Sequence, residues 1–138
     1  MIILDTNVVS AMLAGTSHPA VMSWLDGQSG RQVGITAITA AELLFGVAVL
    51  PQGRRRSALD RAVRDALEAL GEALPFSGEA ARYYAERVAR ARSNGYQVST
   101  ADGFIAAIAA AHGATVATRD VAPFEACGVP VVNPWNAG

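Results

Sequence analysis

The chain has 138 residues, 51% of them hydrophobic, and a formal net charge of −1. This length and apolar content suit one globular domain with its own core, and the charge gives no overall basic signature for nucleic acid. All eleven basic residues are arginines, which excludes a Walker A lysine, a Schiff-base lysine and a lysine that senses a phosphoryl group.

Strands alternate with helices along the chain. Short apolar runs predict strands at 2–4, 33–38, 73–76 and 114–117, and a last short strand in VPVVNP near the end. Periodic apolar residues, caps and stop signals predict helices at 7–13, 18–26, 40–50, 54–70, 78–93 and between Ser99 and Gly113, with a turn at 118–120. This order predicts an α/β fold with a mostly parallel sheet covered on both faces. No linker divides the chain, so we expect a single domain over 1–138.

Four of the twelve acidic residues occupy similar places in this pattern. Asp5 ends the first strand, Glu42 lies in the first turn of the helix after the second strand, and Asp120 follows the strand at 114–117. Ligands of parallel α/β sheets bind beyond the carboxyl ends of the strands, so these three acids are expected to converge. Asp102, in the first turn of its helix, joins them if that helix starts at the same edge.

Each of these acids also has a purely structural interpretation. Asp5 can cap a helix and Asp120 can hold a turn. The segments TAAE (39–42) and STAD (99–102) have the spacing of a capping box or a near relative of it. Each acid alone fits local structure as well as it fits a site. Because four independent caps need not share one edge of a sheet, their joint placement favours a site.

Carboxylates brought close together repel one another and cannot all stay ionised without a cation. An oxygen-only site suits Mg²⁺ or Mn²⁺, and such a site binds phosphates and can activate water for attack on phosphorus. The neutral side chains that we expect to orient the acids or water are Thr6, Asn7 and Thr118. The alternative role of these residues is to cap helices and turns.

The sequence gives little support for a zinc or histidine metal site, or for a membrane-spanning segment. Cys127 is the only cysteine, which excludes an intramolecular disulfide and a thiolate zinc cluster. His18 and His112 lie far apart and form no histidine-rich metal motif. We see neither a signal peptide nor a run of about eighteen apolar residues, so we expect a soluble cytoplasmic protein with no membrane partner.

Four segments, LDTNV, TAAELLFGV, ADGFIAAIAAAHG and VATRDVAPFEACGVPVVNPW, follow one another along the chain. Together they resemble the motifs of PIN-domain ribonucleases, and more narrowly of the VapC toxins of bacterial toxin–antitoxin pairs, including the FitB-like branch. The resemblance covers essentially the whole chain. It implies a three-layer α/β/α sandwich whose acids gather Mg²⁺ or Mn²⁺. It also implies cleavage of RNA that leaves a 5′-phosphate and a 3′-hydroxyl.

The resemblance also assigns roles to individual residues. By motif, the family's catalytic and metal-binding acids correspond to Asp5, Glu42, Asp102 and Asp120. Thr118 matches the small hydroxyl residue before the last acid, although some relatives have asparagine at the position of Asp120. Many relatives carry an acid or amide where this chain has Pro123, a departure that we expect to alter the loop and leave the metal ligands alone. The family also implies a homodimer and a small VapB-like antitoxin that can place a basic side chain in the acidic site.

Arg119, beside the proposed site, is the candidate for a contact with an RNA phosphate. The alternative is that it is only a solvated loop arginine.

A haloacid-dehalogenase-type phosphatase would need an aspartate in place of Asn7 and usually a lysine, and a receiver domain would also need a lysine. Both are therefore excluded. A non-catalytic interaction module whose acids are all caps remains open, as does an RNA-processing nuclease of the same fold. A neighbouring antitoxin gene would favour the toxin.

Overall fold

A short parallel sheet lies at the centre of the computed structural model, which describes residues 1–137. Its strands are β1 (Ile2–Leu4), β2 (Val33–Gly34), β3 (Thr115–Ala117) and β4 (Val131–Val132). They are ordered β2-β1-β3-β4, and each neighbouring pair is parallel. The predicted α/β fold with a parallel sheet is therefore confirmed.

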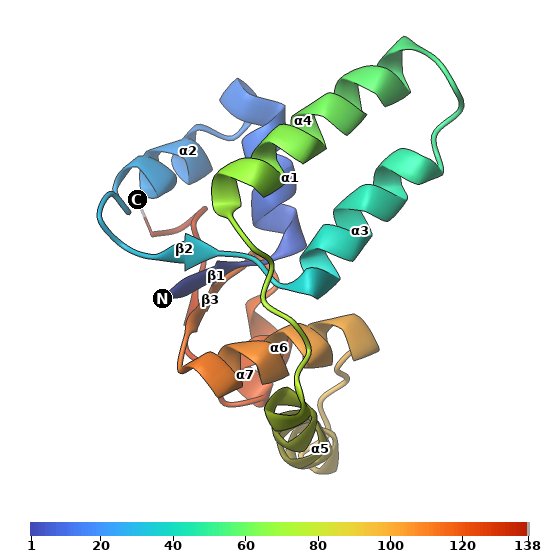
Figure 1. The fold of residues 1–138 in the computed structure, drawn as a ribbon. Helices are drawn as coiled ribbons and strands as arrows, with labels where there is room; N and C mark the ends of the chain where they lie inside the picture. The colour runs from blue at the N-terminus through green and yellow to red at the C-terminus, as the bar shows by residue number, and fades with distance from the viewer. Residues whose placement is uncertain (138) are drawn as a thin grey trace.

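Helices connect the strands and make up most of the chain (Figure 1). None of the helices within residues 1–137 is long and apolar enough to cross a membrane. The helices are α1 (Thr6–Ala14), α2 (Pro19–Asp26), α3 (Ala37–Ala48), α4 (Arg54–Leu70), α5 (Gly78–Ser93), α6 (Thr100–His112) and α7 (Val121–Ala126), with a short 3₁₀ helix at Gly15–Ser17.

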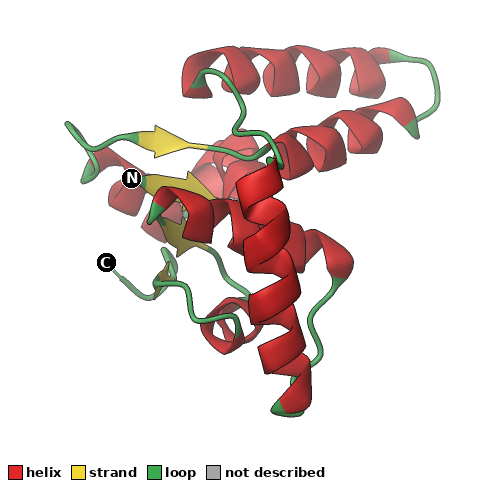
Figure 2. Cartoon of the chain, turned by 60° about the horizontal axis from the view of Figure 1, so that its bottom comes forward, coloured by secondary structure: helices red, strands yellow, loops and turns green. Residues whose placement is uncertain are grey.

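The helices form two layers, one on each face of the sheet. Successive side chains of a strand point to opposite faces. Ile3 accordingly packs in the core with Ile105 of α6 and Phe124 of α7, while Ile2 and Leu4 pack in the core that α1 to α4 provide. Figures 1 and 2 show the sheet between these two groups of helices. The predicted three-layer arrangement follows from the alternation of three buried apolar residues.

Tight packing between α5 and α6 fixes the start of α6. A Cβ atom added to Gly103 would lie 2.7 Å from Cε2 of Tyr84 and 3.0 Å from Cγ2 of Val88 on α5. A glycine at this position lets the two helices approach closely. Asp102 precedes this glycine, so the contact also determines where Asp102 meets the sheet edge.

The second helix–strand unit differs from its prediction. β2 ends at Gly34 and α3 begins at Ala37, because the side chain of Thr36 caps α3 by accepting from the Thr39 N–H at 3.2 Å. The predicted capping box at 39–42 is therefore wrong. Glu42 lies in the second turn of α3, where its side chain does not cap the helix.

Two further elements were mispredicted. The segment 73–76 is not a strand, since it makes one isolated bridge, between Thr36 and Leu74, and Pro75 has no N–H with which to extend a ladder. The turn predicted at 118–120 is present as a bend, but the helix that follows it, α7, was not predicted, and Asp120 occupies the position before its first residue. Pro123 lies in the first turn of α7, where proline is tolerated, so it did not prevent this helix.

Candidate active site

Asp5 lies at the carboxyl end of β1 and is only 5% exposed. Its Oδ1 accepts the N–H of Thr6 at 2.8 Å, so it caps α1, as its structural interpretation required. Its Oδ2 accepts the Thr118 hydroxyl at 2.8 Å and the amide nitrogen of Asn7 at 3.4 Å. Three donors therefore fix both oxygens of this buried carboxylate.

Thr118, at the end of β3, connects the strands to the rest of the site. Its side chain is fully buried, and its Oγ1 accepts from Nδ2 of Asn7 at 3.2 Å and from the backbone N–H of Asp120 at 3.0 Å while donating to Asp5. Oδ1 of Asn7 in turn accepts the backbone N–H of Arg119 at 3.1 Å. Asn7 and Thr118, two of the three predicted orienting residues, thus tie β1 to the segment after β3.

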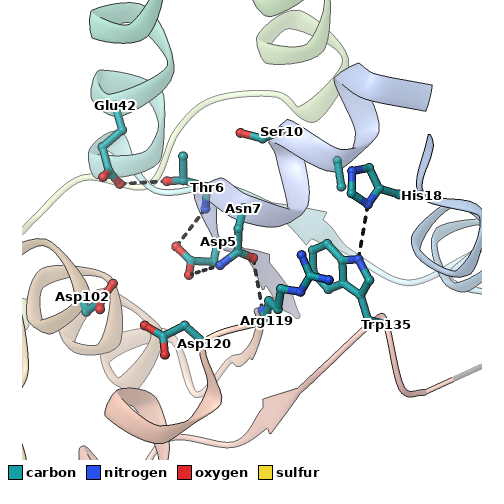
Figure 3. A pocket seen from close by; sticks show the side chains of 11 residues that line it. Asp5, Thr6, Asn7, Ser10, His18, Glu42, Asp102, Arg119, Asp120 and Trp135 are labelled. Carbon is teal, nitrogen blue, oxygen red and sulfur yellow. Dashed lines mark hydrogen bonds between the residues drawn. The ribbon is translucent and has the colours of Figure 1, made fainter. Parts of the chain in front are cut away.

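Glu42 reaches the same place from α3. The hydroxyl of Thr6 donates to its Oε1 at 2.8 Å (Figure 3). The same hydroxyl lies 3.2 Å from the hydroxyl of Thr39. Thr6 therefore links the two acids, because its backbone N–H donates to Asp5 and its hydroxyl donates to Glu42. The Glu42 carboxylate is exposed and can accept further ligands.

Asp102 and Asp120 complete the ring of acids. Asp102 stands in the first turn of α6, where its backbone N–H donates to Oγ of Ser99 at 3.1 Å. Asp120 is exposed, and its side chain makes no cap bond to α7. Among residues 1–137, no side-chain donor bonds to the carboxylate of Asp120, and Ser99 is the side chain that bonds to Asp102, so both carboxylates can accept a further ligand. Asp102 was expected to join the other acids only if its helix started at the same sheet edge. Helix α6 does begin there, beside Asp5 and Asp120 (Figure 3).

All four acids line one pocket of about 450 Å³. Their mutual repulsion is visible in their ionisation. Burial, and then repulsion from Glu42 and Asp120, raises the pKa of Asp5 although the bonds from Thr118 and Thr6 oppose the shift. Burial and repulsion, chiefly from Asp5, likewise raise the pKa of Asp102 against the opposing bond from Ser99. The pocket therefore holds more negative charge than its own residues neutralise.

Helix capping does not account for this convergence. Asp5 caps α1, and Asp102 lies in a Ser99-capped first turn. Glu42 lies inside α3, and the side chain of Asp120 caps nothing. Two of the four acids therefore face the pocket without a structural task at a helix end.

The donor set fits a hard divalent cation. Apart from His18, whose Nδ1 accepts from Trp135, the metal-binding groups in the pocket are carboxylates. A cation would relieve the repulsion that, after burial, raises the pKa of Asp5 and Asp102. In the part of the chain that the structure describes, no three acidic, histidine or cysteine side chains stand close enough to enclose a bare ion. Carboxylates spread around a pocket suit an ion that keeps part of its water shell, as Mg²⁺ does.

The predicted site lacked four residues that line the pocket, namely Ala11 and the three polar or aromatic residues Ser10, His18 and Trp135. Ser10 lies one turn after Thr6 on the same face of α1, so helical spacing could have identified it. His18 and Trp135 are brought in by the start of α2 and the segment after β4, and no spacing in the sequence indicated this. The predicted site residues that line the pocket are Asp5, Thr6, Asn7, Glu42, Asp102, Arg119 and Asp120, with Thr118 buried beneath them.

Comparison with known proteins agrees with this geometry. Residues 2–128 match the PIN domain family. The chain is 47% identical over 138 residues to VapC ribonuclease Y4jK of Sinorhizobium fredii and 41% identical over 138 residues to toxin FitB of Neisseria gonorrhoeae, with 99% of each chain covered in both cases. It superposes on the crystal structure of FitAcB from Neisseria gonorrhoeae with a TM-score of 0.90 and 41% identity, covering 99% of both chains. The chain therefore belongs to the PIN-domain family and, within it, to the group of VapC and FitB toxins.

Proposed function

We propose that this protein is a divalent-metal-dependent endoribonuclease and the toxin of a toxin–antitoxin pair. The names of its relatives, VapC ribonuclease and toxin FitB, support a ribonuclease and a toxin. The observation that carries the metal-dependent mechanism is the single pocket that Asp5, Glu42, Asp102 and Asp120 surround. Its unbalanced negative charge must be compensated before a polyanionic RNA chain can enter.

The four acids are the proposed ligands of Mg²⁺ or Mn²⁺. When bound, such an ion supplies charge neutralisation at the scissile phosphate and a lowered pKa of a coordinated water. Asp5 is the fixed ligand, since three hydrogen bonds hold its carboxylate in one orientation. Asp102 and Asp120 line the same pocket, and no side-chain donor of residues 1–137 bonds to the exposed carboxylate of Asp120.

The remaining groups orient the reactants. Thr118 and Asn7 hold Asp5, and Thr6 holds Glu42 through a bond of 2.8 Å. An exposed carboxylate such as Glu42 can accept the proton of the attacking water. The water oxygen bonds to phosphorus, the bond from phosphorus to the 3′-oxygen breaks, and the 3′-oxygen takes up a proton. The products are a 5′-phosphate and a 3′-hydroxyl.

Partner binding has a place beside the pocket. An apolar groove of about 390 Å³ runs between α1, α3 and α4, where Leu13, Leu43 and Leu59 line it, and it ends at Thr6 and Glu42 of the site. An amphipathic antitoxin segment lying in this groove would bring its end to the acids, where a basic side chain could neutralise them.

We further propose that residues 1–138 act as one PIN domain and that the toxin is a homodimer. Light scattering of the purified protein would test the dimer.

Incubation with total RNA tests the proposal. The intact, antitoxin-free protein should produce discrete fragments with Mg²⁺ or Mn²⁺, and EDTA or the substitution Asp5→Asn should abolish them. Sequencing of fragment ends should find 5′-phosphates and 3′-hydroxyls. Identical RNA in all lanes, with the protein shown to be folded, would refute the nuclease and favour an interaction module.

A further inference from the structure

Arg119 lines the acidic pocket without pairing with any of its acids. Within residues 1–137, the salt bridges are Arg64–Asp60 and Arg90–Glu86, both on exposed helix faces away from the site. A flexible cation beside several carboxylates gains Coulomb energy by approaching them. Something in the structure therefore holds the Arg119 guanidinium elsewhere.

The group that holds it is the indole of Trp135. The Cζ of Arg119 lies 4.5 Å from the centroid of the Trp135 ring, in cation–π geometry (Figure 3). Figure 3 shows the side chain of Arg119 extending toward the indole, with Asp102 and Asp120 on the other side of its backbone. The stack keeps a positive group at the margin of the pocket.

Both partners of the stack are themselves fixed. The Trp135 Nε1–H donates to Nδ1 of His18 at 3.4 Å, the two rings meet edge to face at 5.9 Å, and the backbone N–H of Trp135 donates to Oδ1 of Asn133 at 3.0 Å. The backbone N–H of Arg119 donates to Asn7. The indole is thus a positioned platform, with its placement set by the start of α2 and the turn after β4.

We propose that Trp135 is a positioning residue that holds the Arg119 guanidinium away from the acids, so that it binds an RNA phosphate next to the scissile one and leaves the acids free for the metal. The proposal rests on the nuclease function proposed above. A guanidinium offers a planar set of donors to a phosphate, and one that stacks on an aromatic face keeps those donors exposed at its edge. Without the indole, Arg119 would turn to the carboxylates and compete with the metal.

This competition can be tested by metal affinity, which a purely structural role of Trp135 would leave unchanged. Mn²⁺ binding is measured by calorimetry for the full chain and for Trp135→Leu, Arg119→Gln and the double variant. We expect Trp135→Leu to weaken Mn²⁺ binding about fivefold, and the double variant to recover the affinity of Arg119→Gln, because the competing cation is then gone. Trp135→Phe, which keeps an aromatic face, should stay within about twofold of wild type. Thermal unfolding checks that each variant is folded.

Initial rates on a short single-stranded RNA that contains a mapped cleavage site provide the second readout. Arg119→Gln and Trp135→Leu should each raise KM more than they lower kcat, and Arg119→Gln should reduce the slope of log affinity against log salt by about 0.7. Arg82→Gln, which removes the same charge from an exposed residue of α5, should change neither.

The outcomes separate the two proposals. If the wild-type protein neither binds Mn²⁺ nor cleaves RNA, the proposed function fails and this inference fails with it. If the wild type does both, the inference alone is overturned by a Trp135→Leu variant that binds Mn²⁺ like the wild type. A double variant that stays as weak as Trp135→Leu would overturn it equally.

Discussion

The hydroxyl of Thr118 donates to Oδ2 of Asp5 at 2.8 Å, joining two residues that lie 113 positions apart in the sequence. Both side chains are buried, and they follow neighbouring parallel strands, β1 and β3. The pair shows how this fold builds a site. The sheet places the ends of two strands together, and a small neutral side chain then orients a carboxylate that burial would otherwise destabilise.

Replacing Thr118 by valine tests that relationship. The substitution keeps the shape of the side chain, removes the donor to Asp5 and leaves the N–H of Asp120 without its acceptor. We expect the free energy of unfolding to fall by about 1–3 kcal/mol, because buried polar groups are left unpaired. Urea unfolding measures the effect. Thr118→Ser retains the hydroxyl and should lose clearly less, and equal losses for the two variants would count against the hydroxyl.

The pH dependence of stability should reveal the burial and crowding of Asp102. The folded-state pKa of Asp102 lies above its ordinary value of 3.8. The folded state therefore holds this proton more tightly, and the resulting stability is full below that value and lost as pH rises through the folded-state pKa. In EDTA, Asp102→Asn should thus unfold at a higher temperature than wild type at neutral pH, and the difference should shrink toward acid pH. A constant difference across the titration would contradict the assignment.

Metal binding should reverse this relation. A ligand that binds only the folded state raises the melting temperature, so Mn²⁺ or Mg²⁺ should stabilise the wild type in a concentration-dependent way. Asp102→Asn should show little or no shift, since one proposed ligand of the ion is gone. Asp65→Asn, an exposed change on α4, serves as the control. A shift in Asp102→Asn as large as that in the control would show that the ion binds elsewhere.

Two glycine substitutions should have opposite effects on stability. Gly46→Ala in α3 meets no atom within 4 Å and should stabilise the protein by about 0.5–1 kcal/mol, as alanine does in a helix. Gly103→Ala would place its Cβ 2.7 Å from Tyr84, and the overpacking should cost about 1–3 kcal/mol. Denaturant unfolding compares them. A stabilised Gly103→Ala would mean that α5 and α6 have room to separate.

The sequence was most informative where buried apolar strands end on polar residues. The run from Ile2 to Leu4 predicted a strand covered on both faces, and the acid that follows it does lie at the sheet edge. Alternation of strands and helices was enough to predict that Asp5, Glu42 and Asp120 come together. These inferences depend on local pattern and on the geometry of parallel sheets, which one sequence contains.

Other features depend on competition between nearby signals or on packing. Thr36 and Thr39 are both plausible caps for α3, and only the position of the helix on the sheet selects Thr36. The approach of Trp135 to Arg119 and His18 needs the turn after β4 to lie over the start of α2, and no periodicity encodes that contact. The family resemblance identified the acids but not this aromatic platform.

The most direct test of the account is the rate at which matched variants cleave RNA in Mn²⁺. The wild type, Asp102→Asn and the control Asp65→Asn are compared at equal, verified folded concentrations on one RNA substrate. Loss of a proposed metal ligand should lower the rate of Asp102→Asn at least about a hundredfold, while Asp65→Asn should retain the wild-type rate. Cleavage by Asp102→Asn at the rate of the control would contradict a metal-dependent nuclease built on these four acids.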